Sequence, residues 1–275
     1  MRGTPTLAER AWATLVWVFV GFFILNLAGL VATVVTSSFA TRWLRSWLPS
    51  GWTTRWYGAA WEEFQLGDVL LATAEVVGLV VLISGALGIP AAYALARRDF
   101  PGKRAVMLLI LLPLLVPPIT FGIPLATVLY QTHLAGSLAG VVVANLVPTV
   151  PFVILVMVPF IEQIDPRIEQ AARVFGATTP RLFRHVLLPL LLPGILAALL
   201  LVLVRTVAMF ELTFLVSGPT SQTLVVALYY AVFAAGVRAV QSVDAMAVVY
   251  MVTTLIWLLI ALRFVNPVQI VARGR

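Results

Sequence analysis

The chain has 275 residues, of which 61% are hydrophobic and 11% are charged. Soluble domains carry about a quarter charged residues, so this composition excludes an ordinary soluble globular protein. The formal net charge is +7, and in a membrane protein basic residues mark cytoplasmic loops more often than a nucleic-acid partner. The chain has no cysteine, and its two histidines lie far apart, so we expect no disulfide, cysteine nucleophile or metal site.

Six apolar stretches are long enough to cross a bilayer, which takes about 20 mostly apolar residues in a helix. They cover 12–35, 69–96, 105–130, 138–161, 188–216 and 241–263. The first stretch exceeds the apolar region of a secretory signal and lacks a clear cleavage site, so we expect a retained span. The shorter segment 221–236 is a re-entrant helix, an interfacial helix or the start of a bent span. The sequence therefore predicts an all-α integral membrane protein with six transmembrane helices.

The distribution of Lys and Arg predicts the orientation of these spans. With a cytoplasmic N-terminus, 13 basic residues fall in inside segments and four in outside segments, while Arg205 lies within a span. Basic residues concentrate in cytoplasmic loops, so we expect both termini and the segment 165–189 in the cytoplasm.

The predicted outside loop, 37–68, is rich in tryptophan. It contains Trp43, Trp47, Trp52, Trp56 and Trp61. Tryptophan favours the membrane interface, so the loop is expected to form an interfacial helix on the outer leaflet. A surface that meets an external partner is a compatible alternative.

Helix-breaking residues cluster in the third and fourth spans. These candidate break positions are Pro113, Pro117, Pro118, Gly122, Pro124, Pro148 and Pro151. Proline removes a backbone donor and clashes with the preceding turn, so both helices are expected to be kinked or locally unwound. Irregular backbone at membrane depth is tolerated beside protein or a water-filled cavity, which favours a solute pathway nearby. Kinks that only improve packing are the alternative.

Four polar residues within or near the spans are candidates for a solute pathway: Glu75, Asn145, Arg205 and Glu211. Ionisable groups in a membrane usually face a partner or an aqueous route. Arg205 and Glu211 are six residues apart and so lie on different faces of an ideal helix. Each is therefore expected to find a partner elsewhere, either in a structural ion pair or along the solute route.

The segment 165–189 is the longest charged and polar interruption between apolar stretches. Asp165 and Pro166 are suited to cap and start a helix, and an apolar stripe follows at Ile168, Ala171, Ala172 and Phe175. Gly176 is placed to end that helix in the left-handed conformation. Thr179 and Pro180 then predict a second amphipathic helix before Leu188 and Pro189 lead into the fifth span. The alternative is an amphipathic loop that packs only on its own bundle.

This segment resembles the EAA loop of binding-protein-dependent ABC importer permeases with the MetI-like core. The family motif is Glu-Ala-Ala, three residues, Gly, nine residues, Ile, one residue, Leu-Pro. Gln170, Ala171, Ala172, Gly176, Val186, Leu188 and Pro189 stand at the matching spacings. Gln170 replaces Glu, although Glu169 is adjacent, and Val186 replaces Ile. The wider resemblance runs from about 69 to 263.

The resemblance implies a permease that hydrolyses nothing itself and couples to a cytoplasmic ATPase. The implied coupling residues are Glu169, Gln170, Ala171, Ala172, Phe175, Gly176, Val186, Leu188 and Pro189. The implied partners are a second permease, two ATPase subunits that bind ATP and Mg, an extracytoplasmic solute-binding protein and lipid of the bacterial inner membrane. The sequence lacks a GxxxxGK[ST] phosphate loop and implies no cofactor in this chain.

The expected domains are an N-terminal span with the Trp-rich segment (1–68), the permease core (69–263) and a cytoplasmic tail (264–275). Within the family, ARRDFPGKR after the second span and TFLVSG after the fifth resemble the polyamine group, with sugar-type permeases close behind. The solute is expected to be a small polar molecule, polyamine-like or a carbohydrate. A membrane-embedded enzyme using Glu75, Glu211 or Asp244, and a stand-alone channel or scaffold, are the competing classes.

Overall fold

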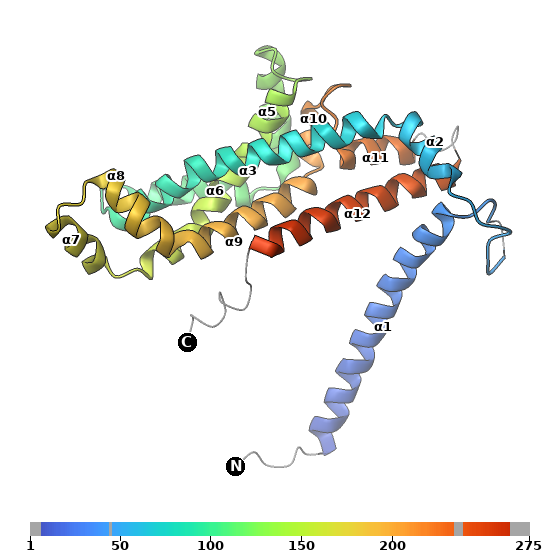
Figure 1. The fold of residues 1–275 in the computed structure, drawn as a ribbon, viewed down its shortest axis with the longest axis horizontal. Helices are drawn as coiled ribbons and strands as arrows, with labels where there is room; N and C mark the ends of the chain where they lie inside the picture. The colour runs from blue at the N-terminus through green and yellow to red at the C-terminus, as the bar shows by residue number, and fades with distance from the viewer. Residues whose placement is uncertain (1–6, 44–45, 234–238, 265–275) are drawn as a thin grey trace. The chain divides into compact units, whose positions relative to one another are not determined.

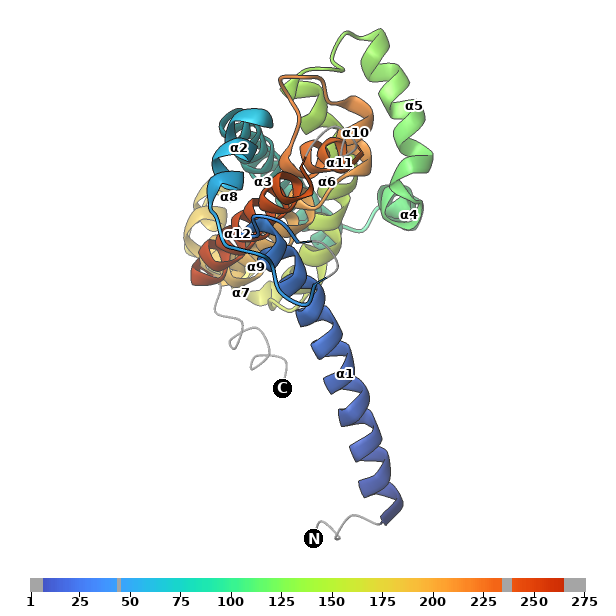
Figure 2. The ribbon, with the colours of Figure 1, turned by 90° about the vertical axis from the view of Figure 1, so that its right-hand side faces the viewer.

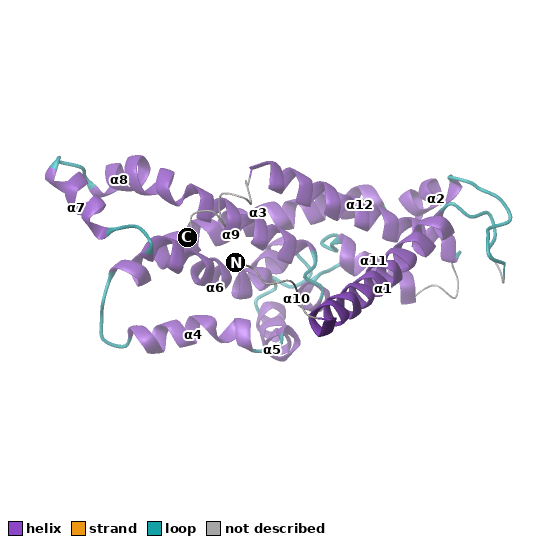
Figure 3. Cartoon of the chain, turned by 90° about the horizontal axis from the view of Figure 1, so that it is seen from below, coloured by secondary structure: helices purple, strands orange, loops and turns teal. Residues whose placement is uncertain are grey.

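The structure is a computed structural model that describes residues 7–43, 46–233 and 239–264. These residues form helices joined by loops, with one isolated antiparallel bridge between Ala40 and Trp52 (Figure 3). The helices are α1 (Leu7–Ser38), α2 (Arg55–Glu63), α3 (Leu66–Arg97), α4 (Lys103–Leu115), α5 (Pro118–Gln131), α6 (Leu138–Glu162), α7 (Pro166–Val174), α8 (Thr179–Leu182), a π-helical turn (Phe183–Leu187), α9 (Leu188–Val207), α10 (Glu211–Val216), α11 (Leu224–Phe233) and α12 (Val240–Phe264) (Figure 1).

The chain divides into two compact units, which are described separately. One comprises residues 1–63 and 231–249, and the other comprises residues 64–230 and 250–275. Among the described residues, five helices are long and apolar enough to cross a membrane, and the bent pair α4 and α5 makes a sixth span if it is counted as one. The prediction of an all-helical membrane protein is therefore confirmed.

The third predicted span is sharply bent. Helices α4 and α5 meet at 99° (Figure 2). The break falls at Val116 and Pro117, which have extended backbone with ψ of 135° and 136°. A residue before proline avoids the helical region, and Pro117 and Pro118 supply no backbone donor, so the helix ends and restarts here. Pro113 and Pro124 lie inside α4 and α5 instead, as does Gly122, which is buried in α5.

The fourth span is one continuous helix, so the local unwinding expected at Pro148 and Pro151 is wrong. Helix α6 continues through both prolines, which are buried within it. Neighbouring helices can compensate for proline in membrane helices. Helix α6 packs against α3 and α9, so it stays continuous.

The fifth span begins and ends earlier than 188–216. A continuous helix runs from Thr179 to Val207, and α10 begins again only at Glu211. Before the break, the amide of Met209 donates to Thr206 over 3.1 Å in a tightened last turn. Phe210 then stacks on Phe214, with ring centroids 5.1 Å apart.

The core of the larger unit lies between α3, α6 and α9, which pack against one another. Buried valines of α3, such as Val76 and Val80, meet Val153 and Met157 of α6 and Leu191 of α9. This three-helix layer carries the segment 165–189 at one end and the first turn of α3 at the other (Figure 1).

Among its described residues, the predicted Trp-rich loop holds one short helix, α2. The indole Nε1 of Trp56 donates to the carbonyl of Ala40 over 2.7 Å. Trp47 is 98% exposed, and Trp52 and Trp61 are also exposed. In the same unit, the Ser37 hydroxyl of α1 donates to the Asp244 carboxylate of α12.

Two other predicted segments include residues that the structure does not describe. Helix α11 lies within the predicted segment 221–236, whose last three residues are outside the described residues. Of the predicted tail 264–275, only Phe264 is described.

Candidate functional site

The segment 165–189, called here the docking segment, opens with a capped helix. The carboxylate of Asp165 accepts a hydrogen bond from the Arg167 amide over 2.9 Å, and Pro166 occupies the first turn of α7. The cap satisfies an otherwise unpaired donor, and proline there loses nothing. Helix α7 therefore starts where the sequence pattern places it.

Gly176 ends α7 in a tight turn. Its φ is +80°, a conformation that glycine adopts without strain. The Ala177 amide donates to the Ala172 carbonyl over 3.0 Å, and the Gly176 amide donates to the Arg173 carbonyl over 2.9 Å. These two bonds form the Schellman arrangement, which pairs the last carbonyls of a helix.

The second helix of the docking segment is continuous with the fifth span, which corrects the expected junction at Leu188 and Pro189. Its first helical residue is Thr179, and the capping position is occupied by Thr178. A π-helical turn follows, in which the Leu188 amide donates to the Phe183 carbonyl. Proline lacks an amide hydrogen, and such a local π adjustment lets a membrane helix pass through it. The second helix of the docking segment is thus continuous with α9.

The apolar residues of α7 face away from the chain's own core. Phe175 is 90% exposed and Val174 is 85% exposed. Ile168 and Ala171 are also exposed, and only Ala172 of the predicted stripe packs against the core. The alternative of a loop that packs only on its own bundle therefore does not describe this helix.

A shallow pocket of about 320 Å³ lies between the two helices of the docking segment. It is lined by Ala172, Phe175, Ala177, Arg181, His185 and Val186. Its small apolar floor and basic rim suit a protein surface that offers an apolar side chain with acidic neighbours.

Glu169 faces the chain's own interior, in contrast to these exposed neighbours. It is buried, and its two carboxylate oxygens accept from the Tyr93 hydroxyl (2.6 Å) and from Nε of Arg97 (2.7 Å). Gln170 is exposed. The sequence pattern missed Tyr93 and Arg97, although their four-residue spacing places them on one face of a helix.

The four candidate pathway residues have different surroundings. Asn145 is fully buried and its amide nitrogen donates to the Val141 carbonyl (2.9 Å) and to the Thr213 hydroxyl (3.2 Å), so it links α6 to α10. The Arg205 guanidinium lies over the Phe152 ring at 5.3 Å. Within the described residues, neither Arg205 nor Glu211 forms an ion pair.

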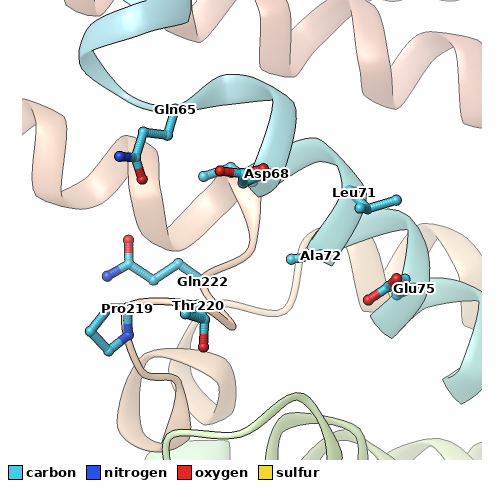
Figure 4. Close-up of a pocket in the computed structure, with 9 residues that line it drawn as sticks. Gln65, Asp68, Leu71, Ala72, Glu75, Pro219, Thr220 and Gln222 are labelled. Carbon is cyan, nitrogen blue, oxygen red and sulfur yellow. The ribbon is translucent and has the colours of Figure 1, made fainter.

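Glu75 lies in a second pocket, called here the outer pocket, at the start of α3. The outer pocket has a volume of about 260 Å³ and is lined by Gln65, Asp68, Val69, Leu71, Ala72, Glu75, Pro219, Thr220 and Gln222 (Figure 4). Helix α3 supplies both carboxylates, and the loop after α10 forms the opposite wall.

Curated relatives of the chain are transport permeases. The chain is 33% identical over 138 residues to a molybdate/tungstate transport system permease protein of Thermococcus kodakarensis, which covers 50% of this chain and 54% of that protein. It is 34% identical over 160 residues to a molybdenum transport system permease protein of Haemophilus influenzae, covering 52% and 69%. A trehalose transport system permease protein of Mycobacterium tuberculosis is 34% identical over 129 residues, covering 46% and 47%. The chain thus spans about half the length of the Thermococcus and Mycobacterium relatives.

The fold also matches a solved transporter. A crystal structure of a bacterial ABC transporter involved in the import of the acidic polysaccharide alginate aligns with a TM-score of 0.78 at 17% identity, covering 96% of this chain and all of that one. The family described as binding-protein-dependent transport system inner membrane component matches residues 85–268, which is more than half of the chain. The chain therefore belongs to this family of inner membrane transport components.

Proposed function

We propose that the chain is the non-catalytic permease subunit of an ATP-driven importer. It forms half of a solute pathway with a second permease and docks a cytoplasmic ATPase through the docking segment. ATP and Mg are bound by two copies of that ATPase, and an extracytoplasmic binding protein delivers the solute. The observation that carries this proposal is the exposed apolar end of α7, Val174 and Phe175, beside the pocket at Ala172 and Arg181.

Two further observations support the proposal. The ion pair between Arg97 and Glu169 brings together two segments that are both predicted to be cytoplasmic from the distribution of basic residues. A second structural relative, with a TM-score of 0.67 at 18% identity, is a bacterial alginate ABC transporter in complex with an alginate pentasaccharide-bound periplasmic protein.

The solute is a small polar molecule. Relatives carry the names of molybdate, tungstate and trehalose permeases, so an oxyanion or a carbohydrate is the class to test first. The polyamine expectation finds no support among these relatives. Binding of molybdate, sulfate and trehalose to the solute-binding protein that works with this chain distinguishes the classes.

Replacing Phe175 with Asp tests the docking assignment. A carboxylate in place of a 90% exposed phenyl ring removes the apolar contact without disturbing the core. We expect the variant to insert into the membrane and to lose the ATPase on gentle purification. Trp47→Asp is the matched control because Trp47 is 98% exposed in the other unit, and it should keep the ATPase. An ATPase that co-purifies equally with Phe175→Asp and the parent protein refutes the assignment.

A further inference from the structure

Glu169 is the buried carboxylate of an otherwise exposed helix. Its side chain is 10% exposed, and that of Arg97 is 13% exposed. A buried charge is costly unless it is paired and hydrogen-bonded. Here each carboxylate oxygen has its own donor, Tyr93 or Arg97. These two hydrogen bonds offset the cost of burying the Glu169 carboxylate, and they require a defined arrangement of the three side chains.

Arg97 and Tyr93 each reach a second segment as well. The Arg97 guanidinium donates through Nη2 to the carbonyl of Ile164, just before α7, over 2.7 Å. The Tyr93 ring packs edge-on against Phe183 in the π-helical turn, with centroids 5.1 Å apart. The C-terminal end of α3 therefore contacts three places in or beside the docking segment. These are the residue before its cap, helix α7 itself and the π-helical turn that leads into α9.

Helix α3 extends from this joint to the outer pocket. Its 32 residues span about 48 Å at 1.5 Å per residue. Its first turns carry Asp68 and Glu75 into the outer pocket (Figure 4). A displacement of the C-terminal end of α3 along its axis thus moves these carboxylates against the loop that holds Thr220.

We propose that Tyr93, Arg97 and Glu169 form a positioning clasp that makes α7 and the C-terminal end of α3 move as one body. Through it, α3 carries the movement of the docking segment to the outer pocket. This inference rests on the proposed function, in which the bound ATPase moves the docking segment. It assigns Glu169 to the connection inside the permease and leaves the exposed Gln170 and Phe175 for the ATPase.

Spin-label distances test the clasp because the chain has no native cysteine. A pair at Arg167→Cys and Leu87→Cys reports α7 against α3, since both positions are exposed. A pair at Leu71→Cys and Thr220→Cys reports the outer pocket. Each pair is measured in the full complex, without nucleotide and after trapping with ATP and vanadate.

In the parent complex we expect one narrow α7–α3 distance in both states and a change of the outer-pocket distance on trapping. In Glu169→Gln and in Arg97→Met, we expect a broad α7–α3 distribution and loss of the outer-pocket change, while the ATPase still co-purifies. Lys103→Met is the matched control because it removes the cation of an exposed ion pair with Asp99 (3.1 Å) and should behave as the parent.

A narrow α7–α3 distance or a retained outer-pocket change in both clasp variants overturns the proposal. If neither variant folds, Tyr93→Phe removes only one hydroxyl, and it should broaden the α7–α3 distance; an unchanged distribution overturns the clasp. Absence of any ATPase from the parent preparation contradicts the proposed function instead, and the α7–α3 pair still tests the clasp by itself.

Discussion

Substitutions of Gly176 test the left-handed turn of the docking segment, because there is space for a side chain at this position. Its φ is +80°, and an added Cβ would meet no atom within 4 Å. The left-handed conformation costs a β-branched residue about 1–2 kcal/mol, whereas asparagine tolerates it. We expect Gly176→Val to reduce co-purification of the ATPase and Gly176→Asn to retain it. Equal retention by both variants would show that docking does not depend on this turn.

Arg205, in the last turn of α9, and Glu211, at the start of α10, are two charged residues whose role is open to experiment. Neither is ion-paired within the described part of the chain, so neutralising one does not strand the other. We expect Arg205→Gln and Glu211→Gln to change uptake of the solute with little loss of folded protein. The measurement compares uptake with the monodisperse yield of each variant. Parallel losses of uptake and yield would indicate a structural role instead.

At the scale of elements, the contact between α5 and α10 depends on a glycine. A Cβ at Gly122 would come within 2.9 Å of Leu212 and Leu215 side-chain atoms. Overpacking of a well-packed contact costs about 1–3 kcal/mol, so we expect Gly122→Val to lower the apparent melting temperature in detergent. Gly78→Val is the control, because Gly78 is a helical glycine with nothing within 4 Å. A melting temperature as high as that of the control would refute this contact.

The elements also show where sequence patterns succeed and fail. Adjacent prolines at 117 and 118 end α4, because together they remove two donors and force Val116 to be extended. The prolines at 148 and 151 do not break α6, because it is packed against α3 and α9. Proline spacing alone does not separate these cases.

For the whole molecule, the orientation in the membrane is a prediction that cysteine labelling can check. Single cysteines at Phe175 and Arg98 should be protected from an impermeant maleimide added to intact cells, and cysteines at Trp47 and Thr220 should react. All four positions are exposed and the background contains no cysteine. Permeabilised cells that lack the ATPase partner provide the control, in which all four should react. Labelling of Phe175→Cys from outside would reverse the orientation.

The sequence by itself determined the class of the protein and the position of the docking segment. Long apolar runs have few stable solutions in a bilayer, because every backbone group must be paired within a helix. The cap at Asp165 and the turn at Gly176 are local features, so their residue types alone predict them.

Only the tertiary structure decided which way each side chain of that segment faces. Glu169 and Gln170 are adjacent and both polar, and the direction of Glu169 depends on Tyr93 and Arg97, more than 70 residues earlier in the chain. The π-helical turn that joins the segment to α9 was not predicted from the sequence either, although Pro189 is a local feature that favours it. Burial and pairing between distant residues are tertiary properties, which a single sequence does not reveal.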